Sequence, residues 1–166
     1  MTTGPPRPPL PRSLYVETTS RCNSKCQTCI LTFGGREPAR DLTLAEFRRI
    51  VDQFPVLERV VLHGIGEPLL VRDLPAMIRH AKARGAQVLF NSNAITLTRR
   101  WQEALVDAGL DELRVSLDAS TRATYARIRG VDALDRVLDN LERLARLKGE
   151  LGSVPHAPAC RCGSRL

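Results

Sequence analysis

Short apolar runs alternate with longer segments of helical periodicity along the central part of the chain. Four runs are rich in Val, Leu and other strand-forming residues, and they cover residues 14–16, 60–62, 88–90 and 113–117. Uninterrupted apolar runs of this length, bounded by polar residues, are typical of strands that are buried on both faces. We therefore predict four strands, each followed by a polar or glycine-containing segment.

After each strand, apolar residues recur every three or four positions, which predicts amphipathic helices. These helices cover residues 44–54, 74–81, 101–108 and 134–147. Thr43 and Glu46 form a capping box at the start of the first helix, and Pro55 ends it. The remaining start and stop signals are Asp73 and Gly85, Thr98 and Gly109, and Gly149.

Four strand–helix units in a row predict an α/β fold with a parallel sheet covered by helices. Two architectures satisfy this order: an open doubly wound sheet and a segment of a β/α barrel. In both, the chemistry lies at the carboxyl ends of the strands. The residues that follow each strand are therefore the candidates for function.

The 166 residues (18.4 kDa) predict one domain, and an apolar content of 43% is sufficient for a hydrophobic core. We expect a Pro-rich leader over residues 1–13, a periodic body over 14–148 and an irregular tail over 149–166. No apolar run is long enough to span a bilayer, and the leader has no apolar signal segment. We accordingly expect a cytoplasmic protein without a membrane partner, whose cysteines are ligands or thiols rather than disulfides.

The formal net charge of +7 raises the question of nucleic-acid binding. Much of this excess lies in the two terminal segments, which contain no acidic residue over 1–13 or 151–166. Arginines of the body are interleaved with Asp and Glu, which is typical of solvated helix faces. Aromatic residues make up only 4% of the chain, too few for a platform that stacks bases. Nucleic acid is therefore not expected as the main partner.

Three cysteines follow the first strand in the spacing CxxxCxxC, at Cys22, Cys26 and Cys29. A loop this short can direct three thiolates at a common centre, and a cubane cluster held there would keep one iron without a protein ligand. Such an open position is what a catalytic metal site needs. The alternatives are free surface thiols or a structural zinc site. The candidates for a fourth zinc ligand are His63, Cys160 and Cys162.

Each of the other strands also ends in small or polar residues. The second is followed by residues 63–68, whose two glycines allow a ligand to approach the backbone closely. The third ends in Asn-Ser-Asn at residues 91–93, and the fourth ends near Ser116 and Asp118. Each segment alone is equally explained by a turn or by capping of the following helix. Their shared position on one predicted rim favours a binding site.

These four segments, in this order and spacing, resemble the motifs of the radical S-adenosylmethionine (SAM) superfamily. The stretch Tyr-Ala-Arg-Ile-Arg-Gly at 125–130 strengthens the resemblance, which extends from about residue 14 to residue 147. It implies a parallel partial (β/α) barrel of the radical SAM type. This chain would hold about four of its six β/α units and would be a truncated, N-terminal part of the core domain.

The resemblance also implies roles for individual residues. Cys22, Cys26 and Cys29 would bind three irons of a [4Fe–4S] cluster, and the amino and carboxylate groups of SAM would bind the fourth. Among the cofactor-binding residues, Gly66 and Glu67 would contact the methionine amino group, Ser92 and Asn93 the nucleotide, Ser116 and Asp118 the ribose or carboxylate, and Thr28 the adenine.

The activity implied is reductive cleavage of SAM by the cluster to a 5′-deoxyadenosyl radical, which abstracts hydrogen from a small-molecule or peptide substrate. The protein would orient the reactants, deliver the electron and exclude water and oxygen. An electron donor such as flavodoxin or ferredoxin is implied as a partner. The alternative is a fragment that binds the cluster and SAM without chemistry of its own.

Three features depart from the pattern of the superfamily. Thr28 stands where an aromatic residue is common, and Ile65 separates two glycines that are often adjacent. The chain also ends after four units, which would leave the fourth strand as an open edge. We therefore expect either marginal stability or a partner chain that completes the barrel.

Three further features are not assigned to the cofactor site. His63 is expected to be a core histidine whose hydrogen bonds are satisfied. Glu17, at the end of the first strand, has no assigned role. The tail with Cys160 and Cys162 is expected to be disordered rather than to form a second metal site.

Overall fold

The computed structural model describes residues 9–34 and 38–150. Its strands are β1 (Ser13–Tyr15), β2 (Arg59–Val61), β3 (Gln87–Ser92) and β4 (Glu112–Val115). They form one parallel sheet in the order β1-β2-β3-β4, which confirms the predicted sheet. A doubly wound sheet reverses its strand order at a switch point. The sequential order therefore identifies this sheet as a segment of a β/α barrel wall.

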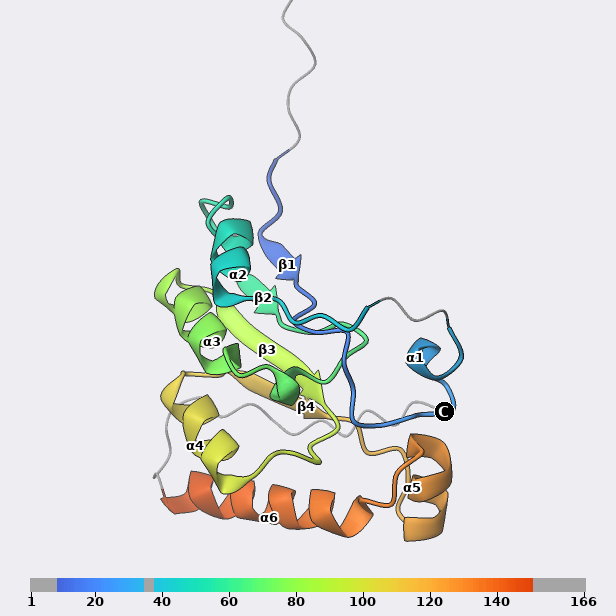
Figure 1. Ribbon diagram of the computed structural model, residues 1–166. Helices are drawn as coiled ribbons and strands as arrows, with labels where there is room; N and C mark the ends of the chain where they lie inside the picture. Colours follow the sequence, from blue (N-terminus) through green and yellow to red (C-terminus); the bar gives the residue numbers. More distant parts are fainter. Residues whose placement is uncertain (1–8, 35–37, 151–166) are drawn as a thin grey trace, which may run out of the picture.

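The predicted helices are present as α2 (Leu44–Val51), α3 (Leu74–Ala83), α4 (Arg99–Asp107) and α6 (Leu134–Glu150). They follow one side of the sheet in an arc (Figure 1). Three elements were not predicted: α1 (Ile30–Phe33), the 3₁₀ turn η1 (Pro68–Leu70) and α5 (Arg122–Arg129). The first two are too short to show a period, and in α5 only Tyr125 is buried, so it lacks an apolar stripe.

The hydrophobic core lies between the sheet and this arc of helices. Val60 and Val88, in the centre of the sheet, belong to the same buried cluster as Phe47 of α2 and Met77 of α3, and all four are inaccessible to solvent. The neighbouring strand residues point to the other face because side chains alternate along a strand. One face of the sheet is therefore apolar and packed, and the other is free to carry polar groups.

Several helix ends follow the predicted signals. The capping box is present, because Thr43 Oγ1 accepts a hydrogen bond from the Glu46 N–H at 3.2 Å and the Glu46 carboxylate accepts one from the Thr43 N–H at 2.9 Å. Gly85 follows α3 with φ of 81°, a conformation that favours glycine. Asp73 and Thr98 occupy the predicted N-cap positions, although neither side chain makes a capping hydrogen bond.

The element boundaries differ from the prediction by a few residues. α2 ends at Val51, and Phe54 packs against the core from outside the helix. β1 begins inside the predicted leader, and α6 extends to Glu150, inside the predicted tail. The rest of the tail, with Cys160 and Cys162, lies outside the described residues.

In the described part of the chain, β4 pairs with β3 alone and forms one edge of the sheet. The spare hydrogen-bonding groups of such an edge can pair with a further strand. Whether the chain is marginally stable or needs a partner chain stays a prediction.

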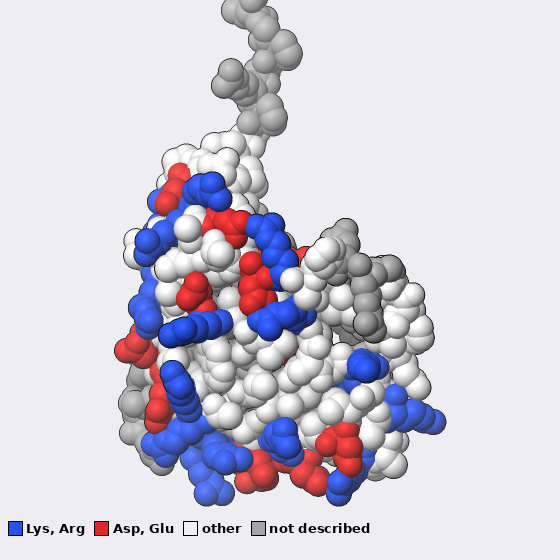
Figure 2. Space-filling view, in the orientation of Figure 1, with Lys and Arg blue, Asp and Glu red and all other residues white. Residues whose placement is uncertain are grey.

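Basic and acidic side chains are interspersed on the face shown in Figure 2. Many form ion pairs, such as Arg79 with Asp107 at 2.8 Å and Arg122 with Asp132 at 2.7 Å. This agrees with the interleaved charges of the sequence. Within residues 9–34 and 38–150, no helix combines the length and the low polarity that a bilayer crossing requires.

Candidate cofactor site

The three cysteines of the CxxxCxxC motif lie on the loop between β1 and α1, beyond the carboxyl end of the sheet (Figure 1). Cys22, Cys26 and Cys29 are free thiols, and each is partly exposed. The Cys29 N–H donates to the Cys26 carbonyl at 3.1 Å, and the Thr32 hydroxyl donates to the same carbonyl at 2.8 Å. The second and third cysteines are thus held by a local turn. Thr28 is exposed within this turn.

Burial raises the pKa of the Cys22 and Cys26 thiols above the usual value. The positive charge of Arg129 opposes this effect at Cys26, because it favours the thiolate. A cation bound by these thiols would displace their protons, so ligand binding here is coupled to proton release.

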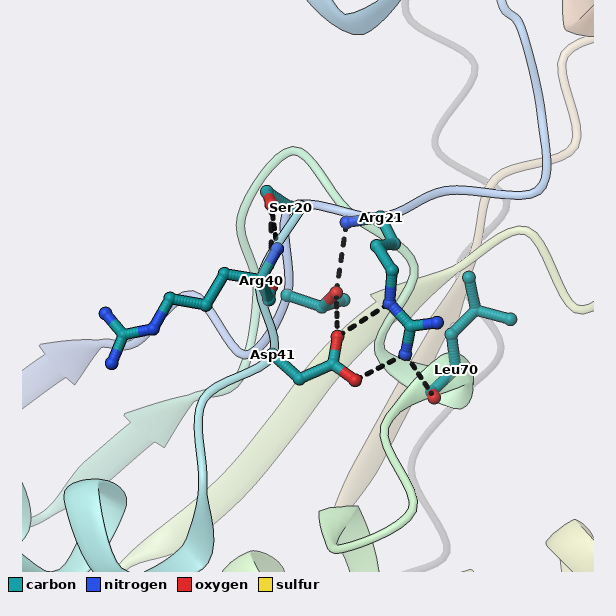
Figure 3. Close-up of polar contacts among 6 residues, drawn as sticks. Ser20, Arg21, Arg40, Asp41 and Leu70 are labelled. Carbon is teal, nitrogen blue, oxygen red and sulfur yellow. Dashed lines mark hydrogen bonds and ion pairs between the residues drawn. The ribbon is translucent and has the colours of Figure 1, made fainter. Parts of the chain in front are cut away.

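A clamp of polar contacts closes the base of the cysteine loop (Figure 3). Thr19 Oγ1 donates to Asp41 at 2.7 Å, and Arg21 Nε donates to the same carboxylate at 2.8 Å. A second Arg21 nitrogen contacts Asp41 and also donates to the Leu70 carbonyl at 3.3 Å. Beside this pair, the Ser20 N–H donates to the Arg40 carbonyl at 3.0 Å. Residues before and after the cysteines are therefore joined, a contact that the sequence did not predict.

The cysteine loop is also attached to the end of α5. The Lys25 N–H donates to the Arg129 carbonyl at 3.1 Å, and the Gln27 N–H donates to the Ile128 carbonyl at 2.9 Å. Gly130 follows with φ of 64°, and a Cβ there would lie 2.2 Å from the Lys25 carbonyl oxygen. The stretch 125–130 thus has a structural reason for its glycine, because its backbone packs directly on the loop.

The loop after β2 packs on the same region from the other side. A Cβ on Gly66 would lie 2.0 Å from the Thr19 carbonyl oxygen, so only glycine fits there. The next residue, Glu67, donates its N–H to the Arg21 carbonyl at 2.8 Å. Glu17 accepts a hydrogen bond from the Ile65 N–H at 2.7 Å. This contact gives Glu17 a role in holding the glycine loop.

Glu67 joins the loops that follow β2 and β3. Its carboxylate is buried and accepts hydrogen bonds from the Ser92 hydroxyl at 2.8 Å, the Asn93 N–H at 2.7 Å and the Leu69 N–H at 3.1 Å. Burial raises the pKa of this carboxyl above its ordinary value, although the three donors favour the ionised form. The Glu67 side chain therefore joins these two loops, independently of any contact that its backbone makes.

Asn93 connects the turn after β3 to the cysteine loop. Its Nδ2 donates to Asn23 Oδ1 at 2.7 Å and to Ser24 Oγ at 3.2 Å, and it lies 3.9 Å from Cys22 Sγ. Its Oδ1 accepts from the Ile95 N–H at 3.0 Å. The amide therefore orders the loop next to the first cysteine.

The last two predicted residues lie at the end of β4. The Ser116 N–H donates to the Ser92 carbonyl at 2.9 Å, which extends the pairing of β4 with β3. Asp118 is exposed and accepts a hydrogen bond from Arg129 at 2.7 Å. The Arg129 side chain is only 12% exposed, and its Nε is buried without a hydrogen-bond partner. Arg129 is a site residue that the sequence did not predict, and its signal is the second arginine of the stretch 125–130.

The prediction for His63 was wrong. The residue is only partly buried, and its Nδ1 is inaccessible and has no hydrogen-bond partner. Burial lowers the pKa of the imidazole, and the nearby Arg114 lowers it further, whereas Glu17 raises it. His63 is thus a strand-end residue among charged groups rather than a satisfied histidine of the core.

The family model of the radical SAM superfamily matches residues 16–154, and this chain belongs to that superfamily. Its relatives include a probable GTP 3′,8-cyclase of Metallosphaera sedula, which is 34% identical over 128 residues, or 75% of this chain and 40% of the relative. Another is the tungsten-containing aldehyde ferredoxin oxidoreductase cofactor-modifying protein of Pyrococcus furiosus, with 29% identity over 88% of this chain and 41% of the relative. The chain thus spans about two fifths of these proteins.

The fold is similar to that of solved radical SAM structures. Streptococcus suis SuiB bound to S-adenosylmethionine superposes with a TM-score of 0.67 and 21% identity, over 86% of this chain and 32% of that one. A structure of anSMEcpe with bound AdoMet superposes with a TM-score of 0.66 and 18% identity, over 83% of this chain and 42% of that one. Proteins of the superfamily bind a [4Fe–4S] cluster and SAM.

Proposed function

We propose that this chain forms the part of a radical SAM enzyme that binds the [4Fe–4S] cluster and SAM. One observation carries the proposal: the cysteine loop is packed against three segments from other parts of the chain. These are the glycine loop after β2, the turn after β3 and the end of α5, which contact it through Gly66, Asn93 and Gly130. Such an arrangement fixes three thiols at the carboxyl ends of parallel strands, where barrel proteins perform their chemistry.

The donor set fits a cubane cluster. Cys22, Cys26 and Cys29 supply three thiolates, and a cluster with three protein ligands keeps one iron open. A tetrahedral zinc site, the alternative zinc module, would need a fourth ligand, and its candidates Cys160 and Cys162 lie outside the described residues.

When bound, the cluster and SAM would supply the radical chemistry that removes a hydrogen atom from the substrate. The chain's own residues would bind and orient them. The clamp of Arg21 and Asp41 and the Asn93 contact would hold the loop at the spacing that the cluster requires. Gly66 would allow backbone and cofactor to approach closely. Arg129 would place a positive charge beside Cys26 and offset the negative charge of thiolates and carboxylate.

The residue-level assignments are part of this proposal. We assign Gly66 and Glu67 to the methionine amino group, Ser92 and Asn93 to the nucleotide, Ser116 and Asp118 to the ribose or carboxylate, and Thr28 to the adenine. Asp118 would serve together with Arg129, with which it forms an ion pair. The side chains of Glu67 and Asn93 also order the surrounding loops, which explains why a carboxylate and an amide stand at these positions.

The reaction of the whole protein is also a proposal. The relatives are named as cyclases, synthases and maturases, which act on different molecules. We propose a small-molecule or peptide substrate, an electron donor such as flavodoxin or ferredoxin, and barrel completion by further chain or by a partner. A cofactor-binding part without independent activity is the second candidate, favoured by the edge of β4 that has no partner strand within residues 9–34 and 38–150.

The test is anaerobic reconstitution followed by iron, sulfide and zinc analysis. We expect about four irons per chain, as a [4Fe–4S] cluster requires. The triple variant Cys22→Ala, Cys26→Ala, Cys29→Ala should lose them, and the matched double variant Cys160→Ala, Cys162→Ala should retain them. Full iron in the triple variant would contradict the proposal, and about one zinc without iron would favour the zinc module. Formation of 5′-deoxyadenosine from SAM and reductant then separates the enzyme from the cofactor-binding part.

A further inference from the structure

The face of the sheet opposite the helices carries a row of polar residues at the carboxyl ends of the strands. The strand register pairs Asn91 of β3 with Arg114 of β4. It also pairs Tyr15 with Val61 and Val61 with Leu89, so the next residues on the same face are Glu17, His63 and Asn91. The row therefore consists of Asn91 of β3, Arg114 of β4, and two residues that lie two positions beyond the ends of β1 and β2, Glu17 and His63.

Electrostatic coupling supports this row. His63 experiences the charges of both Glu17 and Arg114, which belong to opposite ends of the row. Arg114 in turn experiences Tyr15, which lies across the sheet on the other edge strand. These side chains therefore share one space over the face of the sheet, although up to about a hundred residues separate them in the chain.

Arg114 supplies the free charged donors of this row. Glu17 accepts a hydrogen bond from the Ile65 N–H at 2.7 Å, which engages one of its carboxylate oxygens. Glu112 receives Arg114 Nε at 2.6 Å, which fixes the guanidinium and leaves its two terminal nitrogens. The Arg114 side chain is 40% exposed, so these nitrogens can be reached from the space above the sheet. His63 contributes a ring whose Nδ1 is buried, which leaves Nε2 for a ligand.

We propose that Arg114 and His63 bind an anionic oxygen group of the substrate, a carboxylate or a phosphate, at the carboxyl end of the sheet on the face opposite the helices. Guanidinium groups bind both anions through paired N–H donors. Glu112 acts as the positioning residue, because its carboxylate holds Arg114 at Nε and directs the free side of the fork toward the row. This inference rests on the proposed function, since the row and the proposed cofactor site both lie at the carboxyl end of the sheet, and it adds the chemical class of the substrate.

The experiment titrates the full chain, labelled with 15N-arginine, with inorganic phosphate, with acetate and with chloride at constant ionic strength. We expect a saturable change of the Arg114 Nε–H resonance with phosphate or acetate, and the stronger of the two identifies the anion. Chloride should produce none. An equal response to all three anions, or no saturation, overturns the proposal because the binding is then adventitious.

Three variants sharpen the result. Arg114→Gln should weaken binding by at least about tenfold, as expected for loss of a charge-assisted hydrogen bond. Glu112→Ala should weaken it by about threefold, because Arg114 Nε then loses the carboxylate that positions the guanidinium. Arg79→Gln, which breaks the exposed Arg79–Asp107 pair at 2.8 Å, is the matched control and should change nothing.

Iron analysis of the same variants separates the two proposals. If no variant assembles a cluster, the proposed function is contradicted. If Arg114→Gln nevertheless loses anion binding, Arg114 is still shown to bind the anion. A full cluster together with unchanged anion binding in Arg114→Gln overturns this inference and leaves the proposed function intact.

Discussion

The helix-covered face of the sheet and the rim at the carboxyl ends of its strands are stabilised in different ways. On the covered face, Phe47, Met77 and Phe90 are completely buried in one apolar cluster. On the rim, the cysteines are partly exposed, and their loop is held by hydrogen bonds to backbone and buried polar groups. The same strands serve both, because neighbouring residues such as Phe90 and Asn91 point to opposite faces.

The difference teaches that stability and cofactor binding reside in largely separate residues. Apolar packing on one side supplies most of the free energy of folding, since burial of apolar surface is the main favourable contribution. Hydrogen bonds on the rim contribute less each but determine where the thiols stand. Substitutions on the two regions should therefore have separable effects on unfolding and on iron content.

The largest effect is expected at Phe47. Phe47→Ala leaves a cavity in the packed face and should lower the free energy of unfolding by about 3–5 kcal/mol. The matched control is Phe33→Ala at the end of α1, where the side chain is 74% exposed and the cost should stay below about 0.5 kcal/mol. Urea unfolding of the two variants measures the difference. Equal costs would show that the covered face is not the source of stability.

Gly66→Ala should separate the two regions most sharply. Its Cβ would overlap the Thr19 carbonyl oxygen, which lies 2.0 Å from that position, so the backbone under the cysteine loop must shift. We expect loss of most reconstituted iron, with a destabilisation of about 1–3 kcal/mol. Gly85→Ala is the control, because φ there is 81° and nothing lies within 4 Å. It should cost about 1–2 kcal/mol and leave the iron content unchanged.

The two regions also differ in how far the sequence predicts them. Uninterrupted apolar runs predicted the four strands, and apolar residues every three or four positions predicted the four long helices, although the ends of these elements are shifted. α5 was not predicted, because Tyr125 is its only buried residue and the helix therefore has no apolar stripe. Short-range signals such as the Thr43 capping box were predicted correctly because the partners are three residues apart.

The sequence predicted which segments form the rim, but it did not predict the hydrogen bonds that join them. The spacing of Cys22, Cys26 and Cys29 is visible in the sequence, whereas the pairing of Arg21 with Asp41 or of Asn93 with Asn23 is not. These partners are 20 and 70 residues apart and meet only after the sheet has formed. Arg129 could not be distinguished from the other arginines until its burial was known.

Glu67→Gln tests the buried carboxylate that joins two loops of the rim. A Gln side chain has one oxygen in place of two, so it cannot accept from Ser92, Asn93 and Leu69 as the carboxylate does. We expect a loss of about 1–3 kcal/mol in the free energy of unfolding, from donors left without partners. Glu58→Gln, in an exposed pair with Arg12 at 2.8 Å, should change it by less than about 0.5 kcal/mol. If both variants change the free energy of unfolding by similar amounts, Glu67 does not have the structural role assigned to it.

The smallest effect is expected at the clamp of Arg21 and Asp41. The hydrogen bond from Arg21 lowers the pKa of Asp41, so the clamp stabilises the folded loop above the ordinary carboxyl pKa and loses this contribution as the pH falls through the lowered value. Asp41→Asn should speed hydrogen exchange of the Ser20 amide, which donates to the Arg40 carbonyl, by about twofold at neutral pH.

The pH dependence distinguishes this clamp from a general loosening of the chain. On acidification, the difference between the natural protein and Asp41→Asn should disappear, because the natural carboxyl is then protonated as well. Asp107→Asn, which breaks the exposed pair with Arg79, should leave the Ser20 amide unaffected at every pH. A difference that persists at acid pH would mean that Asp41 acts through its hydrogen bond from Thr19 rather than through its charge. The rim would then depend on neutral hydrogen bonds alone.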